Sequence, residues 1–427
     1  MIDLYFLSVL IFFSIIAILI IKDRKNMDFK YFLIMRRTKK FRNTIDKIAN
    51  KSVFFWKIVG TVAVIVCLGA MIFGTYMFLN VTYLIITGVI KQPAAQLVIP
   101  IPLEQTAVGP GFIGIPFWFW IIIIGAILIP HEAFHGIIAR AEKIKLRDVG
   151  LMLLLLQFIS IPIVIIYFIY TGTFDFMLFL IALLMSFPGA FVEPEEKQLN
   201  KSKLMTKLRI FSAGSFINIF IGLLLILLVQ NLLWYPNVNG VLITGVNETS
   251  PAGQIGLKPG MILESINGKE INIDFYRYSS MLLTIPKSNT ENITYVIAAQ
   301  SLFENLADYK PGDVVKLNVN GINYDLKLGE HPSYKDFPYI GITSKAYTKN
   351  ISLFSVVFPL FGLMSLLSIL VGTFNILPIY PLDGGLIVKG ITEKYFKKKT
   401  ANRITMAITY ILFIAIVYAF VRGLIPF

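Results

Sequence analysis

The residues most able to do chemistry in this sequence lie together at His131-Glu132-Ala133-Phe134-His135, an H-E-x-x-H motif. Residues four apart share one face of a helix, so the two imidazoles can bind one metal ion while Glu132 projects beside it as the base for an attacking water. The chain has three histidines in total, and a chance match is expected at about one in a thousand or less. The motif therefore predicts metal-dependent hydrolysis.

A catalytic zinc site needs three protein ligands and one open position, so a third ligand must come from elsewhere in the chain. Asp383 is the best candidate, because burying a carboxylate at membrane depth costs free energy and such residues usually have a function. Glycines and prolines flank it and would let the backbone bring the carboxylate close to a helix. A capping role at a cytosolic helix start is the alternative. Glu193, Glu195 and Glu196 are weaker candidates, since we expect them at the water interface.

Two further side chains are candidates for the reaction. Glu132 would act as the general base and then as the proton donor to the leaving amine. Asn218 stands alone on an apolar helix. It could hydrogen-bond an extended substrate or a developing oxyanion, or it could serve only packing between helices.

The elements that must position these residues are membrane helices. Of the 427 residues 56% are hydrophobic, and the mean hydropathy is +0.73, far from a soluble average. Residues 117–129 are almost wholly apolar, and His131 is fifteenth in that segment, which places it about 21 Å into a bilayer core of about 30 Å. We expect the metal site inside the membrane, nearer the cytosolic face, with Pro130 bending the helix or freeing a carbonyl there.

The net charge of +14 follows membrane topology and does not indicate nucleic acid. Basic residues cluster in the connections after alternate apolar segments, in 22–52, 140–147, 197–209 and 389–403, which is the positive-inside pattern. We therefore expect contacts with a lipid bilayer and its anionic headgroups, and no nucleic-acid partner. The single cysteine, Cys67, excludes a disulfide framework and a cysteine zinc site.

Before the motif, residues 2–21 predict a retained helix with its N-terminus outside. Residues 22–51 favour a solvated loop with some amphipathic helix, and residues 53–80 a returning helix. Residues 81–116 contain too many prolines and glycines for a span and predict an outer re-entrant or hairpin segment.

After the motif, residues 149–192 predict either two spanning helices or a re-entrant structure that breaks at 170–175 and ends in irregular backbone at 187–194. An inward-to-outward helix follows at 210–234. Residues 237–345 show short runs with period-two alternation, which predicts a soluble β-rich domain outside the membrane. Two further apolar segments, 351–374 and 404–420, enclose a Pro-rich stretch.

The chain resembles the site-2 proteases, intramembrane metalloproteases that cut transmembrane segments of regulatory proteins. The resemblance rests on His131-Glu132-x-x-His135, on Asn375-x-x-Pro-x-x-Pro-Leu-Asp383-Gly-Gly, and on a PDZ-like domain between them with Gly240-Val-Leu-Ile and Ile266-Asn-Gly. It covers about residues 117–427, and is closest to the archaeal and eukaryotic branch. It implies Zn²⁺ at His131, His135 and Asp383, with Glu132 as catalytic base. It also implies substrate binding at Asn218, and we assign Asn375 and Gly384 of the second motif to the substrate as well.

We therefore expect a polytopic α-helical membrane protein with about 6–8 transmembrane helices, re-entrant segments and one inserted extracytoplasmic PDZ-like domain. Its predicted parts are the N-terminal helices with the basic connection and outer segment (1–116), the first catalytic part (117–236), the PDZ-like domain (237–348), and the second catalytic part (349–427). It should be a multi-pass cell-membrane protein with the active site toward the cytosol.

The predicted function is zinc-dependent regulated intramembrane proteolysis of a single-pass membrane protein. A peptide or unstructured segment should bind the PDZ-like domain by strand addition. Unwound substrate should meet Gly/Pro-rich strand edges around 93–116, 188–194 and 375–385, and substrates should carry helix-weakening residues near the cut.

Two rival functions fit the sequence less well. An inactive scaffold that binds clients through the PDZ-like domain would not need Glu132. A metal transporter would need polar residues along its helices, whereas here they cluster at one level.

Overall fold

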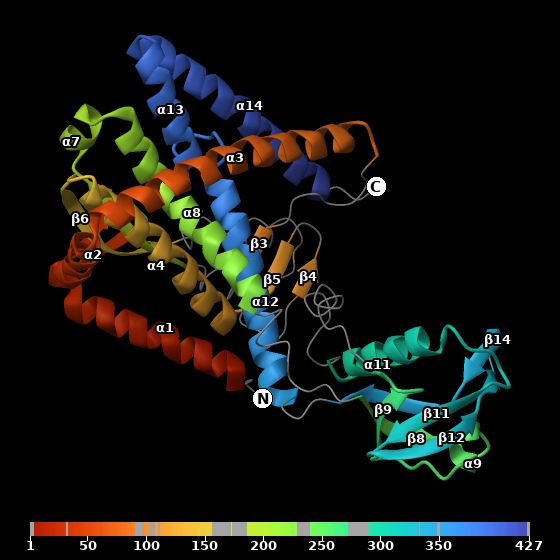
Figure 1. Ribbon diagram of the computed structural model, residues 1–427. Helices are drawn as coiled ribbons and strands as arrows, with labels where there is room; N and C mark the ends of the chain where they lie inside the picture. Colours follow the sequence, from red (N-terminus) through yellow and green to blue (C-terminus); the bar gives the residue numbers. More distant parts are fainter. Residues whose placement is uncertain are drawn as a thin grey trace. The chain divides into compact units, whose positions relative to one another are not determined.

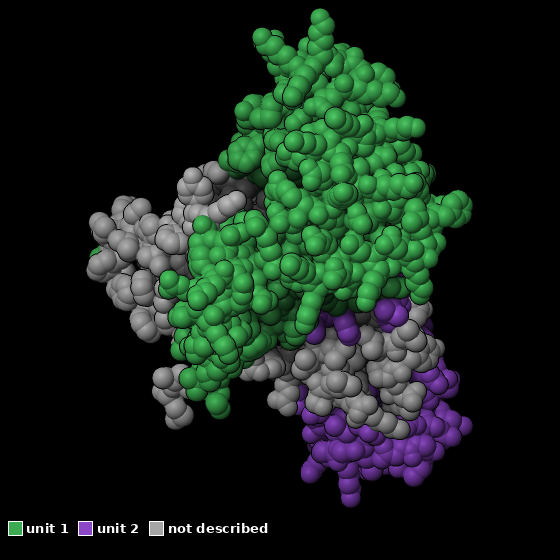
Figure 2. All heavy atoms as spheres, turned by 90° about the vertical axis from the view of Figure 1, so that its left-hand side faces the viewer, with its two compact units in different colours: residues 1–225, 364–427 green, residues 226–363 purple. Residues whose placement is uncertain are grey.

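The protein is described by a computed structural model that covers residues 4–30, 33–89, 97–101, 107–109, 112–155, 172, 186–228, 240–271, 290–332, 334–347 and 351–424. The chain divides into two compact units, residues 1–225 with 364–427 and residues 226–363, coloured green and purple in Figure 2. The first unit contains all the residues expected at the metal site, and the second contains the segment expected to form the inserted domain.

Helices make up most of the first unit (Figure 1). In chain order they are α1 (Leu4–Asp23), the short 3-10 helix η1 (Arg24–Asn26), α2 (Lys39–Lys51), α3 (Val53–Ile86), α4 (Phe117–Ala141), α7 (Glu196–Lys201), α8 (Leu204–Leu228), the end of α12 (Ile351–Asn375), α13 (Asp383–Tyr395) and α14 (Lys398–Leu424).

Four of the described helices are long and apolar enough to cross a membrane: α3, α4, α8 and residues 398–419 of α14. A shorter apolar stretch, residues 360–375, forms the end of α12. The four helices support a membrane protein. The expected number of 6–8 spans remains a prediction, because only the described part of the chain bears on it.

Polar side chains cap the N-termini of helices α2 and α3. The Thr38 hydroxyl accepts the Phe41 N–H at 3.2 Å at the start of α2, and Ser52 does the same for Phe55 at 3.4 Å at the start of α3. The helix α4 runs without interruption through Pro130 and carries the H-E-x-x-H motif in its second half.

A four-stranded antiparallel sheet lies in the first unit, in the order β1-β2-β6-β7. Its strands are β1 (Met27–Lys30), β2 (Leu33–Arg37), β6 (Leu146–Leu155) and β7 (Ser186–Pro194). The expected solvated loop over 22–51 is therefore wrong for β1 and β2, and the expected irregular backbone over 187–194 is wrong for β7. Pairing satisfies the backbone N–H and C=O groups, which an irregular segment beside apolar surroundings would leave unpaired.

A glycine allows two of these strands to approach closely. A Cβ at Gly150 on β6 would lie 2.1 Å from the carbonyl oxygen of Arg36 on β2, so a larger residue would force the strands apart. The break expected at 170–175, like most of residues 156–185, lies outside the described residues.

The segment expected to be re-entrant forms three short strands and the end of a helix. Helix α3 continues to Ile86, beyond the end expected at residue 80. The strands β3 (Leu97–Ile101), β4 (Ala107–Gly109) and β5 (Phe112–Pro116) form a sheet in the order β3-β5-β4, with β3 parallel and β4 antiparallel to β5. The last strand leads directly into α4.

The second unit is rich in β structure. Its main sheet has the order β12-β11-β9-β8-β15, with β10 pairing β9, and a separate hairpin joins β13 to β14. The strands are β8 (Val241–Val246), β9 (Ile262–Ile266), β10 (Lys269–Glu270), β11 (Val314–Val319), β12 (Ile322–Lys327), β13 (Gly329–His331), β14 (Tyr334–Tyr339) and β15 (Ile342–Ala346).

Alternating apolar residues form the core of this second unit. Val315, Leu317 and Val319 of β11 are all at most 1% exposed, as period-two alternation requires of one sheet face. The short helix α9 (Pro251–Gln254) and the longer α11 (Thr290–Leu306) complete it, and α11 packs against the edge strand β15. A β-rich domain was expected here, while its PDZ-like character remains a prediction.

Candidate metal centre

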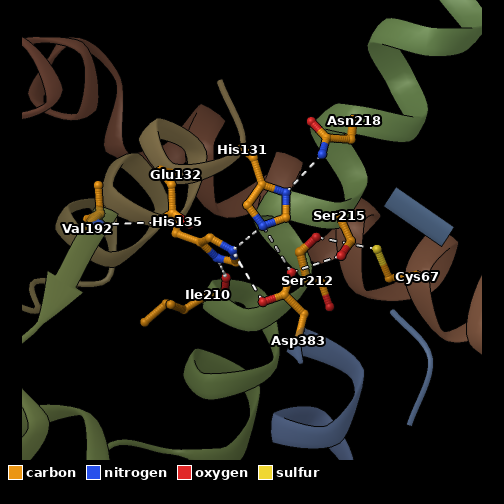
Figure 3. A network of polar contacts seen from close by, with 10 residues as sticks. All are labelled: Cys67, His131, Glu132, His135, Val192, Ile210, Ser212, Ser215, Asn218 and Asp383. Carbon is orange, nitrogen blue, oxygen red and sulfur yellow. Dashed lines mark hydrogen bonds and ion pairs between the residues drawn. The ribbon is translucent and has the colours of Figure 1, made fainter. Parts of the chain in front are cut away.

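The H-E-x-x-H residues lie in the second half of α4. His131 and His135 are one helical turn apart, and their Nε2 atoms lie 3.2 Å from each other (Figure 3). His131 is 5% exposed. The two imidazoles therefore point their Nε2 atoms at one common space, as expected from the spacing.

Asp383 is brought to the same space by the start of α13. Its Oδ2 lies 3.5 Å from Nε2 of His131, and its Oδ1 lies 3.4 Å from Nε2 of His135. The chain turns sharply between α12 and α13, and the glycine after Asp383 permits this turn: a Cβ at Gly384 would lie 1.9 Å from the Ile376 carbonyl oxygen. This close packing explains why a glycine is needed at position 384. The expected role of Gly384 in substrate binding remains a prediction.

The three side chains fit a metal ion. Among the described residues His131, His135 and Asp383 form the one group of at least three such ligands, with their ligand atoms within 4.8 Å of one another. A tetrahedral zinc ion with bonds of about 2.0–2.1 Å would hold its ligand atoms about 3.3 Å apart. The Nε2 atoms of His131 and His135 lie 3.2 Å apart, close to that spacing, and each lies within 3.5 Å of a carboxylate oxygen of Asp383, Oδ2 for His131 and Oδ1 for His135.

Gly214 of α8 keeps the space between these ligands open. A Cβ at this position would lie 2.3 Å from Nε2 of His135 and 2.6 Å from Nε2 of His131. The missing side chain thus leaves room at the point where the two imidazoles converge, which is where a metal ion would bind.

Glu132 faces the edge of the four-stranded sheet. Its Oε2 accepts a hydrogen bond of 3.0 Å from the backbone N–H of Val192 on β7. Glu132 also lines the same cleft as His135 and Asp383. The carboxylate is thereby held beside the proposed ligands, where the sequence motif expects the base.

Helix α8 provides a polar partner for each of the three proposed ligands. His135 Nδ1 lies 2.6 Å from the Ile210 carbonyl oxygen, and the Ser215 hydroxyl donates to Oδ2 of Asp383 at 2.8 Å. The Asn218 amide lies 3.0 Å from Nδ1 of His131.

Sequence reasoning singled out Asn218 on this helix but missed Ile210, Gly214 and Ser215. The signal available was the four-residue spacing of 210, 214 and 218 among small residues on an otherwise apolar helix.

A cleft of about 840 Å³ opens beside the metal centre. It is lined by Glu132, His135 and Asp383 and by further charged residues, namely Arg147, Glu193, Glu196, Lys207, Lys389, Glu393 and Lys398. This arrangement gives polar groups and water a path to residues that are otherwise surrounded by apolar helices.

Two of the acidic residues considered as alternative ligands, Glu193 and Glu196, line the same cleft but are not part of the ligand group. Glu193 forms an ion pair with Arg147, and this hydrogen-bonded carboxylate holds the pKa of Arg147 above its usual range. Among the described residues, Glu193, Glu195 and Glu196 do not join the group that could bind a metal.

Asn375 and Asn218, both expected to bind substrate, do not line the cleft. Asn375 is the last residue of α12 and is half-buried. Asn218 is completely buried, and its contact is with His131.

Comparison with known proteins agrees with this site. Residues 119–419 match the model of peptidase family M50, a range that includes both halves of the metal centre. The chain is also 26% identical over 410 residues to an uncharacterized protein of Methanocaldococcus jannaschii, an alignment that covers 90% of this chain and 89% of that protein. The chain therefore belongs to peptidase family M50, the site-2 protease family.

Proposed function

We propose that this protein is an intramembrane zinc metalloprotease that hydrolyses peptide bonds within or near the transmembrane segments of membrane-anchored regulatory proteins. The observation that carries the proposal is the convergence of His131, His135 and Asp383 on one space beside Glu132. A scaffold protein would not need a carboxylate in that position. The family, whose members depend on zinc in general, supports the same chemistry.

The residues of the site have separate roles in the proposed reaction. His131, His135 and Asp383 would hold Zn²⁺, which supplies a Lewis acid that polarises the scissile carbonyl and activates water. Glu132 takes the proton of the attacking water and delivers it to the nitrogen of the leaving amine. The hydrogen bond from Val192 holds the Glu132 carboxylate in place for both transfers.

A protease of this kind must receive its substrate as an extended chain, because a helix hides its peptide bonds in internal hydrogen bonds. Strand β7 is at the edge of its sheet, and its Val192 N–H points toward Glu132 and away from β6. Since alternate residues of a strand direct their N–H groups to the same side, the N–H of Ala190 points to that free edge as well. These features support the addition of an unwound substrate strand along β7, next to the catalytic base.

The second unit supports a role in peptide binding. Strand β15 is an edge strand of its sheet and lies against α11. An extended segment can add to such an edge by backbone hydrogen bonds. In this proposal the unit is an extracytoplasmic PDZ-like domain that binds a peptide or an unstructured part of the substrate, and the basic connections face the cytosol and contact anionic lipids.

The decisive experiment compares wild-type protein with Glu132→Gln in liposomes that contain zinc and a membrane-spanning test substrate. Mass spectrometry of the products maps the cut. We expect Glu132→Gln to lower the rate by about 10²–10⁴-fold, because a general base is lost. Glu195→Gln removes a carboxylate outside the site and should retain wild-type activity. Equal cleavage by Glu132→Gln and wild type would refute the proposal.

A further inference from the structure

Helix α8 contacts all three proposed metal ligands (Figure 3). His135 and Asp383 have simple partners there, the Ile210 carbonyl and the Ser215 hydroxyl. The third contact, from Asn218 to His131, involves two groups that can each be donor or acceptor. Its direction determines what Asn218 does.

The chemistry of the imidazole fixes that direction. A neutral histidine that binds a metal through Nε2 carries its proton on Nδ1, and this N–H needs an acceptor. For His135 the acceptor is the Ile210 carbonyl oxygen, 2.6 Å away. For His131 the acceptor must be the amide oxygen of Asn218, because an amide nitrogen cannot accept.

The environment of Asn218 fits this requirement. The structure has the amide nitrogen facing Nδ1 of His131, and its Oδ1 is buried with no hydrogen-bond partner among the described residues. Such an orphaned buried oxygen is costly. A half-turn of the amide exchanges the two atoms and gives Oδ1 the Nδ1–H of His131 as its donor.

The main chain of Asn218 is held from the other side by α12. The Ser368 hydroxyl donates to the Asn218 carbonyl oxygen at 2.8 Å, and Ser365 donates to the Gly222 carbonyl oxygen one turn later at 2.9 Å. A Cβ at Gly372 would lie 3.1 Å from Cβ of Asn218. Asn218 is therefore fixed between two helices, completely buried and away from the cleft.

From these contacts we infer that Asn218 is a positioning residue for the metal centre: its amide oxygen accepts the Nδ1–H of His131 and holds that ring with Nε2 toward the metal. Ser215 plays the matching part for Asp383, and the Ile210 carbonyl for His135. The inference rests on the proposed metal site, and it replaces the expected contact between Asn218 and substrate. Partners of this kind typically contribute 10–100-fold to metal affinity.

The test measures zinc affinity of the purified full chain by competition with a chromophoric chelator. Asn218→Leu removes the acceptor and should weaken zinc binding about 10–100-fold. Asn218→Asp restores an acceptor and should bind within about threefold of wild type. Ser212→Ala is the matched control, because it removes a buried hydroxyl of the same helix that has no partner among the described residues.

Two further measurements separate the alternatives. Asn218→Ala, a smaller change than Asn218→Leu, should also weaken zinc binding, and it keeps the test valid if the leucine variant does not fold. Ser215→Ala tests the matching contact to Asp383 and should weaken zinc binding as well. At saturating zinc the KM of Asn218→Asp for the membrane substrate should equal that of wild type.

Wild-type zinc affinity in a folded Asn218→Leu or Asn218→Ala variant, or a raised KM in Asn218→Asp with unchanged zinc affinity, would overturn the inference. A wild-type chain that binds no zinc would instead refute the proposed function itself.

Discussion

The backbone N–H of Val192 donates a 3.0 Å hydrogen bond to Oε2 of Glu132. This contact joins the edge strand β7 to the proposed catalytic base, so the strand that would receive the substrate also positions the group that would activate the attacking water.

This relationship predicts that Val192→Pro is more harmful than its position at a sheet edge suggests. Proline is tolerated in edge strands, but it would remove the N–H that donates a hydrogen bond to the Glu132 carboxylate. A hydrogen bond to a charged group contributes about 1.5–3 kcal/mol, so we expect kcat to fall about tenfold or more. Val192→Ala keeps the N–H and is the control. Equal losses in the two variants would assign the effect to the valine side chain.

Gly214 gives a prediction that does not depend on activity. In Gly214→Ala the new methyl group would lie 2.3 and 2.6 Å from the two imidazole Nε2 atoms, so it would occupy the space of the metal. We expect zinc content, measured by atomic emission, to fall close to zero. Gly125→Ala on α4 is the control, because its Cβ would meet nothing within 4 Å. A full zinc content in Gly214→Ala would place the metal elsewhere.

Metal removal should lower thermal stability. A ligand that binds the folded state alone stabilises it by about 2.7 kcal/mol when its concentration is 100 times its Kd. We therefore expect the Tm of the detergent-solubilised protein to fall after chelation and to recover when zinc is returned. His135→Ala lacks a ligand, so its Tm should not respond to zinc. A similar response in wild type and variant would indicate binding outside the site.

The residue after α4, Glu142, is joined to α8 by a partly buried ion pair. Arg209 donates to Glu142 at 2.6 Å and to the Thr61 hydroxyl at 3.1 Å, and the Glu142 side chain is only 8% exposed. Since Glu142→Gln leaves the partly buried arginine without its counter-charge, we expect a loss of about 1.5–3 kcal/mol, seen as a lower Tm.

The control for this pair is Arg147→Gln. Its ion pair with Glu193 is exposed at 53% and 42% of the two side chains, and exposed pairs contribute only about 0–1 kcal/mol. Similar Tm values for Glu142→Gln and Arg147→Gln would contradict the expectation that the more buried ion pair contributes more to stability.

The metal centre could be predicted largely from sequence, because it depends on rare residues. The spacing of His131 and His135 defines a helical face, and Asp383 is a carboxylate among apolar segments. The supporting partners could not be predicted in the same way. The Ile210 carbonyl leaves no trace in the residue type, and Gly214 and Ser215 resemble the small residues that pack membrane helices in general.

The sheet that contains β7 was missed for a different physical reason. Strand β6 is a nearly continuous apolar run, Leu151–Leu155 at its end, which fits a buried strand and a helix equally well by periodicity. Its partners are remote in sequence, since Met35 pairs with Met152. Such pairing is decided by tertiary contacts, which local patterns do not reveal.

The position of Asp383, at the start of α13 and far from His135 in the sequence, has a consequence for biosynthesis. His135 and Asp383 are 248 residues apart (383 minus 135), and the whole second unit lies between them in sequence. A growing chain on the ribosome therefore has its base and both imidazoles in place long before the third ligand is made. The proposed metal site can close only after the intervening unit has been synthesised, so an unfinished chain lacks the third proposed ligand.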